Sequence, residues 1–327
     1  MPTPENWRIP PEFQPDPGVL GYDLERALSA VVSLRAVVPD DAFTAEVLGT
    51  EREGQGVVIR EDGLVLTIGY LVVEAQEVWL TTAAGRAVRG HALAYDHETG
   101  FGLVQALTPL GVPAVPMGSA KRLAPGAQVV VGAAGGRARS VAARVVARQE
   151  FAGYWEYLID GAIFTAPAHP SWGGAALLGP TGELLGIGSL QLQAQGGDGK
   201  AVPLNMSVPV DLLTPILDSL LRQGDAGAAP RPWLGLYAAE DPDEDGIVLV
   251  GIAGDGPARR AELRAGDVVR AVAGQPVASL ADFYRKLWSL GPAGIDVPLT
   301  VQREEDVFDL RVGSADRARF LKTARMH

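Results

Sequence analysis

The chain has 327 residues, of which 47% are hydrophobic and 20% charged, with 40 glycines and 24 prolines. This length suits two or three domains, and the composition excludes a disordered, collagen-like or coiled-coil protein. The chain has no cysteine, which excludes disulfides, thiol nucleophiles and cysteine-ligated zinc. Its net charge of −11 argues against a nucleic acid or an anionic membrane surface as a partner.

The start of the chain lacks the basic and apolar regions of a secretory signal. The longest apolar run, residues 63–73, is about half as long as a membrane span. The sequence therefore predicts no membrane span. It predicts a cytoplasmic location for the chain as written, and a periplasmic one if a signal peptide has been removed.

In chain order, residues 1–20 are expected to form an extended tail, because their prolines sustain neither a helix nor a central strand. Apolar residues at helical spacing predict a short helix from Tyr22. From about residue 30 to residue 191, short β-rich runs alternate with turn signals. Many short strands at this spacing predict a barrel or a sandwich.

An apolar stripe over residues 209–223 predicts a helix that ends at Gly224. Residues 225–232 are rich in alanine, glycine and proline and are expected to be a linker. Residues 233–315 mix strand and helix patterns in a length that suits one small α+β domain. Residues 316–327 are expected to form a surface tail or a short helix.

Several stretches resemble the HtrA (DegP-like) serine proteases, which join a trypsin-like double barrel to a PDZ domain. They are residues 54–67, 85–107, 117–136 and 172–189 for the barrels and residues 254–283 for the PDZ domain. The resemblance implies a mainly β fold. A first barrel would span residues 21–120, a second barrel and its closing helix residues 121–224, and the PDZ domain residues 233–315.

The resemblance places Tyr70, Gly100 and Trp172 where the family has its catalytic His, Asp and Ser. A phenol with an ordinary pKa near 10 is a poor proton acceptor at neutral pH. Glycine has no side chain to orient a base, and indole offers one donor and no nucleophile. The sequence therefore predicts a degenerate triad, and a pseudoprotease that acts as a scaffold or regulator.

One alternative is an active serine endopeptidase in which Ser171 is a displaced nucleophile and His169 its base. In an extended segment, residues two apart leave the same face, although the rigid Pro170 lies between them and no carboxylate is evident for the histidine. A second alternative is a purely structural oligomer subunit. The histidines show no metal-ligand spacing, so neither a metal site nor a cofactor is predicted.

PDZ domains capture a peptide's C-terminal carboxylate with backbone N–H groups and add the peptide to a sheet edge. The family's hydrophobic-Gly-hydrophobic carboxylate loop is matched by Trp233, Leu234, Gly235 and Leu236, and the later helix offers Leu287 as a groove wall. The expected partners are peptide or protein C-termini and an active protease of the same family. The resemblance also implies a homo-oligomer, a trimer. The alternative for the groove is that the chain itself covers it.

Overall fold

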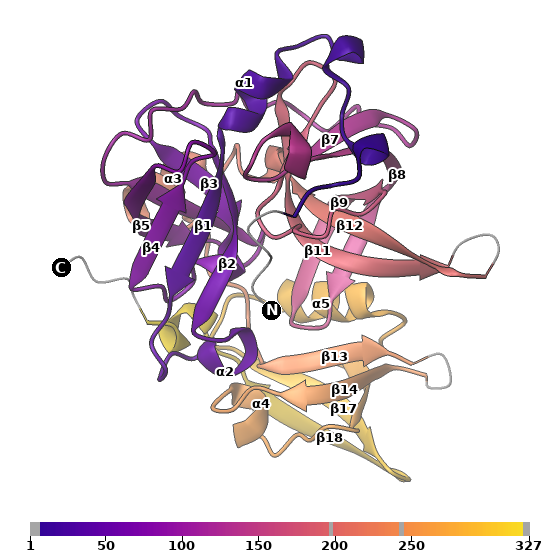
Figure 1. Cartoon of the computed structure of the whole chain (residues 1–327). Helices are drawn as coiled ribbons and strands as arrows, with labels where there is room; N and C mark the ends of the chain where they lie inside the picture. Colours follow the sequence, from indigo (N-terminus) through magenta and orange to yellow (C-terminus); the bar gives the residue numbers. More distant parts are fainter. Residues whose placement is uncertain (1–6, 196–198, 242–244, 323–327) are drawn as a thin grey trace. The chain divides into compact units, whose positions relative to one another are not determined.

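The computed structural model describes residues 7–195, 199–241 and 245–322 (Figure 1). These residues form two compact units. The first contains residues 7–149, 161–227 and 322, and the second contains residues 150–160 and 228–321. The boundary after residue 227 lies inside the predicted linker.

The described part of the N-terminal segment is not simply extended, as the sequence predicted. It contains two single turns of 3-10 helix, η1 (Pro11–Phe13) and η2 (Pro17–Val19), each of which begins with a proline. Proline suits a first helical position because its φ is already helical and the missing N–H has no partner there. Ile9 is buried, and its N–H donates to the Ala138 carbonyl at 2.9 Å. The segment is therefore anchored on the second barrel. Residues 1–6 lie outside the described residues.

The first barrel begins after the expected short helix, α1 (Leu24–Ser29), which is capped by the Asp23 side chain. It is closed in the order β1-β2-β3-β6-β5-β4. Its strands are β1 (Val31–Val37), β2 (Glu51–Val58), β3 (Leu64–Ile68), β4 (Glu77–Thr81), β5 (Ala87–Tyr95) and β6 (Phe101–Ala106). The short helices α2 (Ala45–Leu48) and η3 (Gly69–Leu71) lie in its connections.

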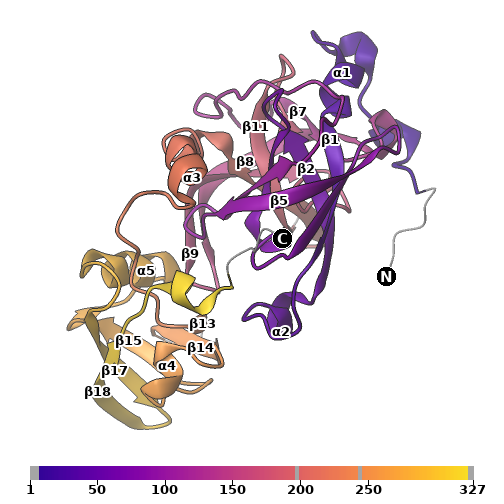
Figure 2. The same ribbon diagram turned by 90° about the vertical axis from the view of Figure 1, so that its left-hand side faces the viewer.

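The second barrel is closed in the order β10-β11-β12-β9-β8-β7. Its strands are β7 (Gln128–Gly132), β8 (Val141–Gly153), β9 (Tyr157–Ala166), β10 (Ala176–Leu178), β11 (Leu184–Gln195) and β12 (Ala201–Pro209), with η4 (Arg137–Arg139) before β8. The predicted closing helix is divided into η5 (Val210–Leu212) and α3 (Leu217–Gln223). It ends, as expected, at Gly224, which adopts the left-handed conformation. Helix α3 packs against β5 (Figure 2).

The second unit contains a sheet in the order β13-β14-β15-β17-β18, with β16 paired to β15. Its elements are β13 (Leu236–Glu240), β14 (Ile247–Ile252), α4 (Pro257–Arg260), β15 (Val268–Val272), β16 (Gln275–Pro276), α5 (Leu280–Ser289), β17 (Asp296–Arg303), β18 (Asp306–Gly313) and η6 (Arg317–Phe320). Strand β13 is an edge strand, and the buried face of α5 supplies Phe283, Tyr284 and Leu287 to the core. The predicted mainly β fold, a double barrel followed by a small α+β domain, is thus confirmed.

The sequence predicted a surface tail or a short helix from residue 316, and the structure contains the short helix η6, which packs on the second unit. Phe320 lies against Trp233, with 4.9 Å between the ring centroids, and Trp233 and Ala315 exchange backbone hydrogen bonds of 3.0 Å. Burial of two aromatic rings stabilises this arrangement. Residues 323–327 lie outside the described residues.

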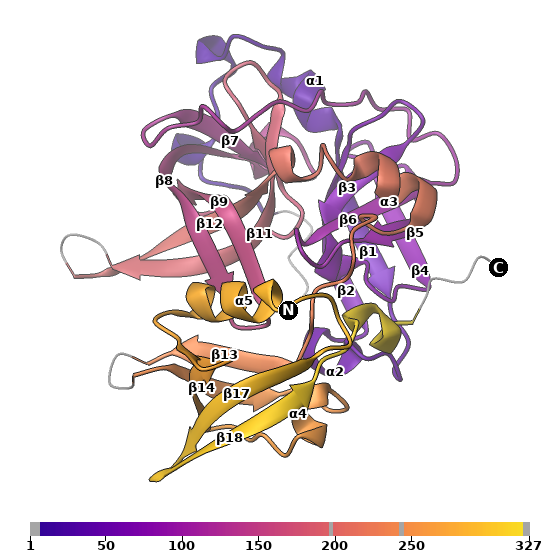
Figure 3. The same cartoon turned by 180° about the vertical axis from the view of Figure 1, so that it is seen from behind.

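The tip of the β8–β9 hairpin belongs to the second unit, although the sequence assigned all of residues 121–224 to the barrel. Ala152 and Leu158 pack against the core of the second unit, and the tip lies beside α5 (Figure 3). Strands β8 and β9 contain 13 and 10 residues, so the hairpin is long enough to bury its end in another core. Strand patterns give the length of a hairpin but do not indicate which core its tip joins.

Candidate functional site

The residue expected in place of the catalytic histidine, Tyr70, lies in η3 with its phenol directed at backbone. Its Oη donates to the Ser189 carbonyl at 3.0 Å. Its own carbonyl accepts from Arg52 Nη1 at 2.9 Å. Burial raises the pKa of the Tyr70 phenol, and a hydrogen bond with the Trp172 side chain only partly opposes this. The phenol therefore stays protonated at neutral pH.

The residue expected in place of the aspartate, Gly100, lies at the end of a tight turn between β5 and β6. Its carbonyl accepts from the N–H of Gly69 at 2.6 Å, so it lies next to Tyr70. Asp96, in the same turn, uses its carboxylate locally and accepts from the Thr99 N–H at 3.0 Å and the Thr99 hydroxyl at 2.5 Å. This carboxylate holds the turn.

The loop that contains Trp172 is bonded to the first barrel through Gly173 and to β11 of the second barrel through Gly174. The Gly173 carbonyl accepts from the Gln55 N–H at 2.8 Å, and the Gly174 N–H donates to the Gly188 carbonyl at 2.8 Å. A Cβ on Gly174 would lie 1.9 Å from the Gln55 carbonyl oxygen, and one on Gly173 would lie 2.8 Å from Tyr70 Oη. The structure therefore brings the Tyr70, Gly100 and Trp172 positions to one place.

Ser171 and His169 are neighbours, but their side chains do not bond to each other. His169 is fully buried, and its Nδ1 accepts from the Ser171 N–H at 3.0 Å. Its Nε2 lies 2.7 Å from the Arg139 carbonyl, which can only accept, so Nε2 carries the hydrogen. Burial also lowers the pKa of His169. Both ring nitrogens of a neutral imidazole are therefore bonded to backbone.

The Ser171 hydroxyl instead accepts from Gln55 Nε2 at 2.5 Å. Gln55 Oε1 accepts from the Ala134 N–H at 2.7 Å. This glutamine therefore ties the first barrel to the loop before Trp172. Sequence reasoning missed Gln55, because its partners lie 79 and 116 positions away and no local pattern marks it.

In the second unit, the predicted carboxylate loop forms a nest of backbone donors. The N–H groups of Leu234, Gly235 and Leu236 all point to one carboxylate. Gly235 has φ of +79°, a left-handed conformation that glycine adopts at little cost. Leu234 and Leu236 are buried in the core of this unit, as is Leu287 on α5. Trp233 precedes the nest and packs on Phe320.

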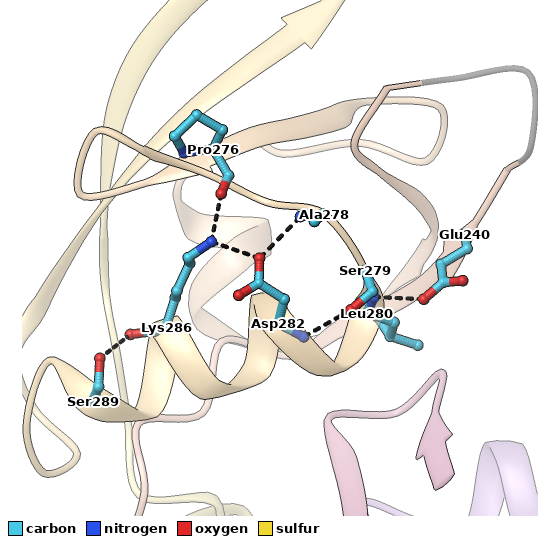
Figure 4. Close-up of polar contacts among 8 residues, drawn as sticks. All are labelled: Glu240, Pro276, Ala278, Ser279, Leu280, Asp282, Lys286 and Ser289. Carbon is cyan, nitrogen blue, oxygen red and sulfur yellow. Dashed lines mark hydrogen bonds and ion pairs between the residues drawn. The ribbon is translucent and has the colours of Figure 1, made fainter. Parts of the chain in front are cut away.

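Helix α5, which the resemblance makes a wall of the peptide groove, is held at its N-terminus by polar contacts (Figure 4). Ser279 caps it by accepting from the Asp282 N–H at 3.1 Å. Glu240, at the end of β13, accepts from the Leu280 N–H at 2.7 Å. Lys286 pairs with Asp282 one turn earlier at 2.5 Å. These contacts fix α5 relative to the edge strand β13.

The carboxylate in the nest is the side chain of Glu156, from the β8–β9 hairpin. Its Oε1 accepts from Gly235 N at 2.6 Å and Leu236 N at 2.9 Å, and its Oε2 accepts from Leu234 N at 3.0 Å. Glu156 is only 6% exposed. Burial raises the pKa of its carboxyl to about 7, although the three N–H donors and Arg317 act in the opposite direction. Sequence reasoning missed Glu156 and left open only that the chain covers its own groove.

Within residues 7–195, 199–241 and 245–322, no group of three or more His, Asp and Glu side chains is placed to hold a metal ion. In the same part of the chain, no helix is both long and apolar enough to cross a bilayer.

Comparison with known families identifies both units. Residues 54–187 match the family of trypsin-like peptidase domains, and residues 234–313 match the PDZ domain family. The chain is an HtrA-like protein. The first range covers most of the two barrels but leaves out β1 and β12, and the second range contains β13 to β18 of the α+β unit.

Curated relatives agree with this assignment. A probable periplasmic serine endoprotease, DegP-like, of Halomonas elongata is 26% identical over 80% of this chain and 56% of its own length. The putative serine protease HhoA of Synechocystis is 26% identical over 82% of this chain and 74% of its own length. The chain thus spans about half the length of the DegP-like relatives. These DegP-like relatives are named as periplasmic, which gives no support to the cytoplasmic expectation.

Solved structures show the same fold. The HtrA-type protease AlgW with a decapeptide has a TM-score of 0.55 at 20% identity, over 92% of this chain and 98% of AlgW. The serine endoprotease from Yersinia pestis has a TM-score of 0.51 at 19% identity, over 90% of this chain and 96% of the other.

Proposed function

We propose that this HtrA-like protein binds peptide or protein C-termini through its PDZ domain and does not hydrolyse them. Its trypsin-like domain serves as a scaffold or regulator. The observation that carries the proposal is the pair of side chains at the barrel site: the half-buried Tyr70 phenol and the Trp172 indole lie at the positions that the family resemblance assigns to a base and a nucleophile. The PDZ match and the nest of three backbone N–H groups support the binding half.

Serine protease chemistry requires a hydroxyl nucleophile hydrogen-bonded to a base, and a carboxylate that orients the base. Tyr70 donates its proton to a carbonyl and cannot remove one from a nucleophile. In a serine protease, loss of the whole triad lowers kcat by about a million-fold. Hydrolysis at this site is therefore expected to be undetectable.

The second candidate function is an active endopeptidase that uses Ser171 and His169, and it is favoured by the names of the curated relatives. To act, Ser171 Oγ would have to leave Gln55 Nε2, and His169 Nδ1 would have to release the Ser171 N–H. Pro170, between them, has no N–H to offer an oxyanion. The two hydrogen bonds that must break and the missing donor make binding without hydrolysis the better-supported function.

A fluorophosphonate probe, which labels activated serines, separates the two functions. The proposal predicts no labelling of the wild type, with trypsin as the positive control. Stoichiometric labelling that vanishes in Ser171→Ala but persists in Ser33→Ala would refute it, because Ser33 is an exposed strand residue far from any histidine in sequence.

The compartment and the assembly are further parts of the proposal. The periplasm is the proposed compartment, because relatives of this chain are named periplasmic. The proposed partners are an active protease of the same family and further copies of this chain. Light scattering tests the assembly, since a trimer has three times the 34.3 kDa mass of one chain. A monomer mass at all concentrations would contradict it.

A further inference from the structure

The tip of the β8–β9 hairpin contacts the nest, the edge strand β13 and helix α5, where a PDZ domain is expected to bind its peptide. A peptide bound to a PDZ domain places its C-terminal carboxylate in a nest of backbone N–H groups and pairs with a sheet edge. Here the Glu156 carboxylate accepts from all three N–H groups of the nest, at 2.6 to 3.0 Å. The nest therefore holds a carboxylate that this chain supplies.

The hairpin contacts both elements that are expected to flank a bound peptide, β13 and α5. On the sheet side, the N–H of Ala238 in the edge strand β13 donates to the Tyr154 carbonyl at 2.8 Å, as it would to an added strand. On the helix side, Tyr284 Oη donates to the Gly153 carbonyl at 2.8 Å and accepts from the Glu156 N–H at 3.1 Å. The tip thus makes the contacts of a peptide ligand on three sides.

The backbone of the tip is held in an unfavourable conformation to make this fit. Glu156 has φ of +57°, a left-handed value that costs a residue with a Cβ roughly 1 to 2 kcal/mol. Arg285 on α5 forms ion pairs with Glu150 on β8 and Asp160 on β9, so it holds both strands of the hairpin. The contacts of the tip with the nest, β13 and α5 must offset this backbone cost, which indicates that they stabilise the tip in this position.

We propose that residues 153–157 are an internal ligand of the PDZ domain, with the Glu156 side chain in the place of a C-terminal carboxylate. This inference rests on the proposed peptide-binding function. An external C-terminus binds the nest only after the hairpin tip leaves it, because one nest holds one carboxylate.

A closed groove lowers the apparent affinity for external peptides by the fraction of molecules in which the groove is open. A tethered ligand competes at a high effective concentration, which keeps that fraction small. Removal of the Glu156 carboxylate leaves the nest donors without their acceptor and raises the open fraction. The affinity for an external carboxylate is then expected to rise at least tenfold.

The test compares wild type, Glu156→Ala and the matched control Glu304→Ala in the full chain. Glu304 is also a glutamate at a hairpin tip with positive φ, at +55°, but it is exposed. Fluorescence anisotropy measures binding of labelled decapeptides that end in free-carboxylate Val, Leu or Phe, with amidated copies as controls. Glu156→Ala should bind the free-carboxylate peptides at least tenfold more tightly than wild type, while Glu304→Ala matches wild type.

Hydrogen exchange at the amides of Leu234, Gly235 and Leu236 supplies a readout that needs no peptide. In Glu156→Ala these amides should exchange at least tenfold faster, while the Val269 amide in the core keeps the wild-type rate and shows that the fold is intact. If Glu156→Ala does not fold, Glu156→Gln replaces it, with a smaller gain expected because an amide oxygen still accepts from Gly235 and Leu236.

The outcomes separate the internal ligand from the proposed function. Equal peptide affinity in wild type and Glu156→Ala overturns the internal ligand and leaves the proposed peptide binding intact. Unchanged hydrogen exchange at the three nest amides also overturns the internal ligand. Faster nest exchange with no peptide bound by any variant refutes peptide binding and supports occupation of the nest by Glu156. Tighter binding of free-carboxylate peptides together with faster nest exchange supports both.

Discussion

The raised pKa of Glu156 predicts that the stability of the second unit falls with increasing pH. The carboxyl has a pKa of about 7 when buried, against an ordinary value of 4.5. The folded state therefore holds the proton more tightly than the unfolded state does. The resulting stabilisation is fully present below pH 4.5 and is lost as the pH rises through about 7.

The size of the effect follows from the two pKa values. The rise from 4.5 to about 7 corresponds to on the order of 3 kcal/mol of unfolding free energy, and about 2.5 kcal/mol of it is lost between about pH 5 and about pH 8. The groups that face the carboxyl are the three nest N–H donors, the Tyr284 phenol and the charge of Arg317. The phenol remains neutral throughout, because its own pKa is raised by burial and by Glu156.

Urea unfolding at these two pH values, followed by tryptophan fluorescence, measures the effect. Wild type should lose about 2.5 kcal/mol more than Glu156→Gln, whose amide does not titrate. Glu304→Gln, with an exposed side chain, should behave as wild type does. If wild type and Glu156→Gln show the same pH dependence, the carboxylate is held as an anion at both pH values and the reasoning fails.

Three further substitutions test contacts that lie inside one unit or the other. Gly174→Ala should lower the unfolding free energy by more than about 3 kcal/mol, because its Cβ would lie 1.9 Å from the Gln55 carbonyl oxygen. The control Gly126→Ala, also at positive φ but with open space around it, should cost only about 1 kcal/mol. Thermal unfolding compares the two variants. Gln55→Ala should cost about 1 to 3 kcal/mol without changing peptide affinity by anisotropy. Burial opposes ionisation of Asp267, but hydrogen bonds from Arg303 hold its pKa below the ordinary value. The stabilisation from ionised Asp267 is therefore lost as the pH falls through its lowered pKa. Urea titrations should show that Arg303→Met lowers the unfolding free energy by about 2 kcal/mol at neutral pH. In this variant, the unfolding free energy should also depend less on pH in the acid range.

The local parts of the fold could be predicted from the sequence, because local physics determines them. Short β-rich runs between turn signals predicted the strands. Gly224 predicted the end of the closing helix, because a residue in the left-handed conformation suits that position. The carboxylate loop was identified through Gly235, whose positive φ the loop requires. Each of these features is encoded within a few neighbouring residues.

The missed features depend on contacts between segments far apart in the sequence. Glu156 lies 78 to 80 positions from its three donors, and in the sequence it is one of several glutamates beside aromatic residues. Gln55 reaches the loop before Trp172 across 116 positions. The N-terminal segment was predicted as an extended tail and the C-terminal one as a surface tail or a short helix, because composition does not reveal the surfaces on which Ile9 and Phe320 pack.

The central claim is binding without hydrolysis, and proteolysis of an unfolded substrate tests it most directly. The chain is incubated with reduced, unfolded casein, and new peptide termini are counted by mass spectrometry for wild type and Ser171→Ala. The account predicts that neither produces termini above the casein-only background. New termini that appear with wild type and are absent with Ser171→Ala would contradict it.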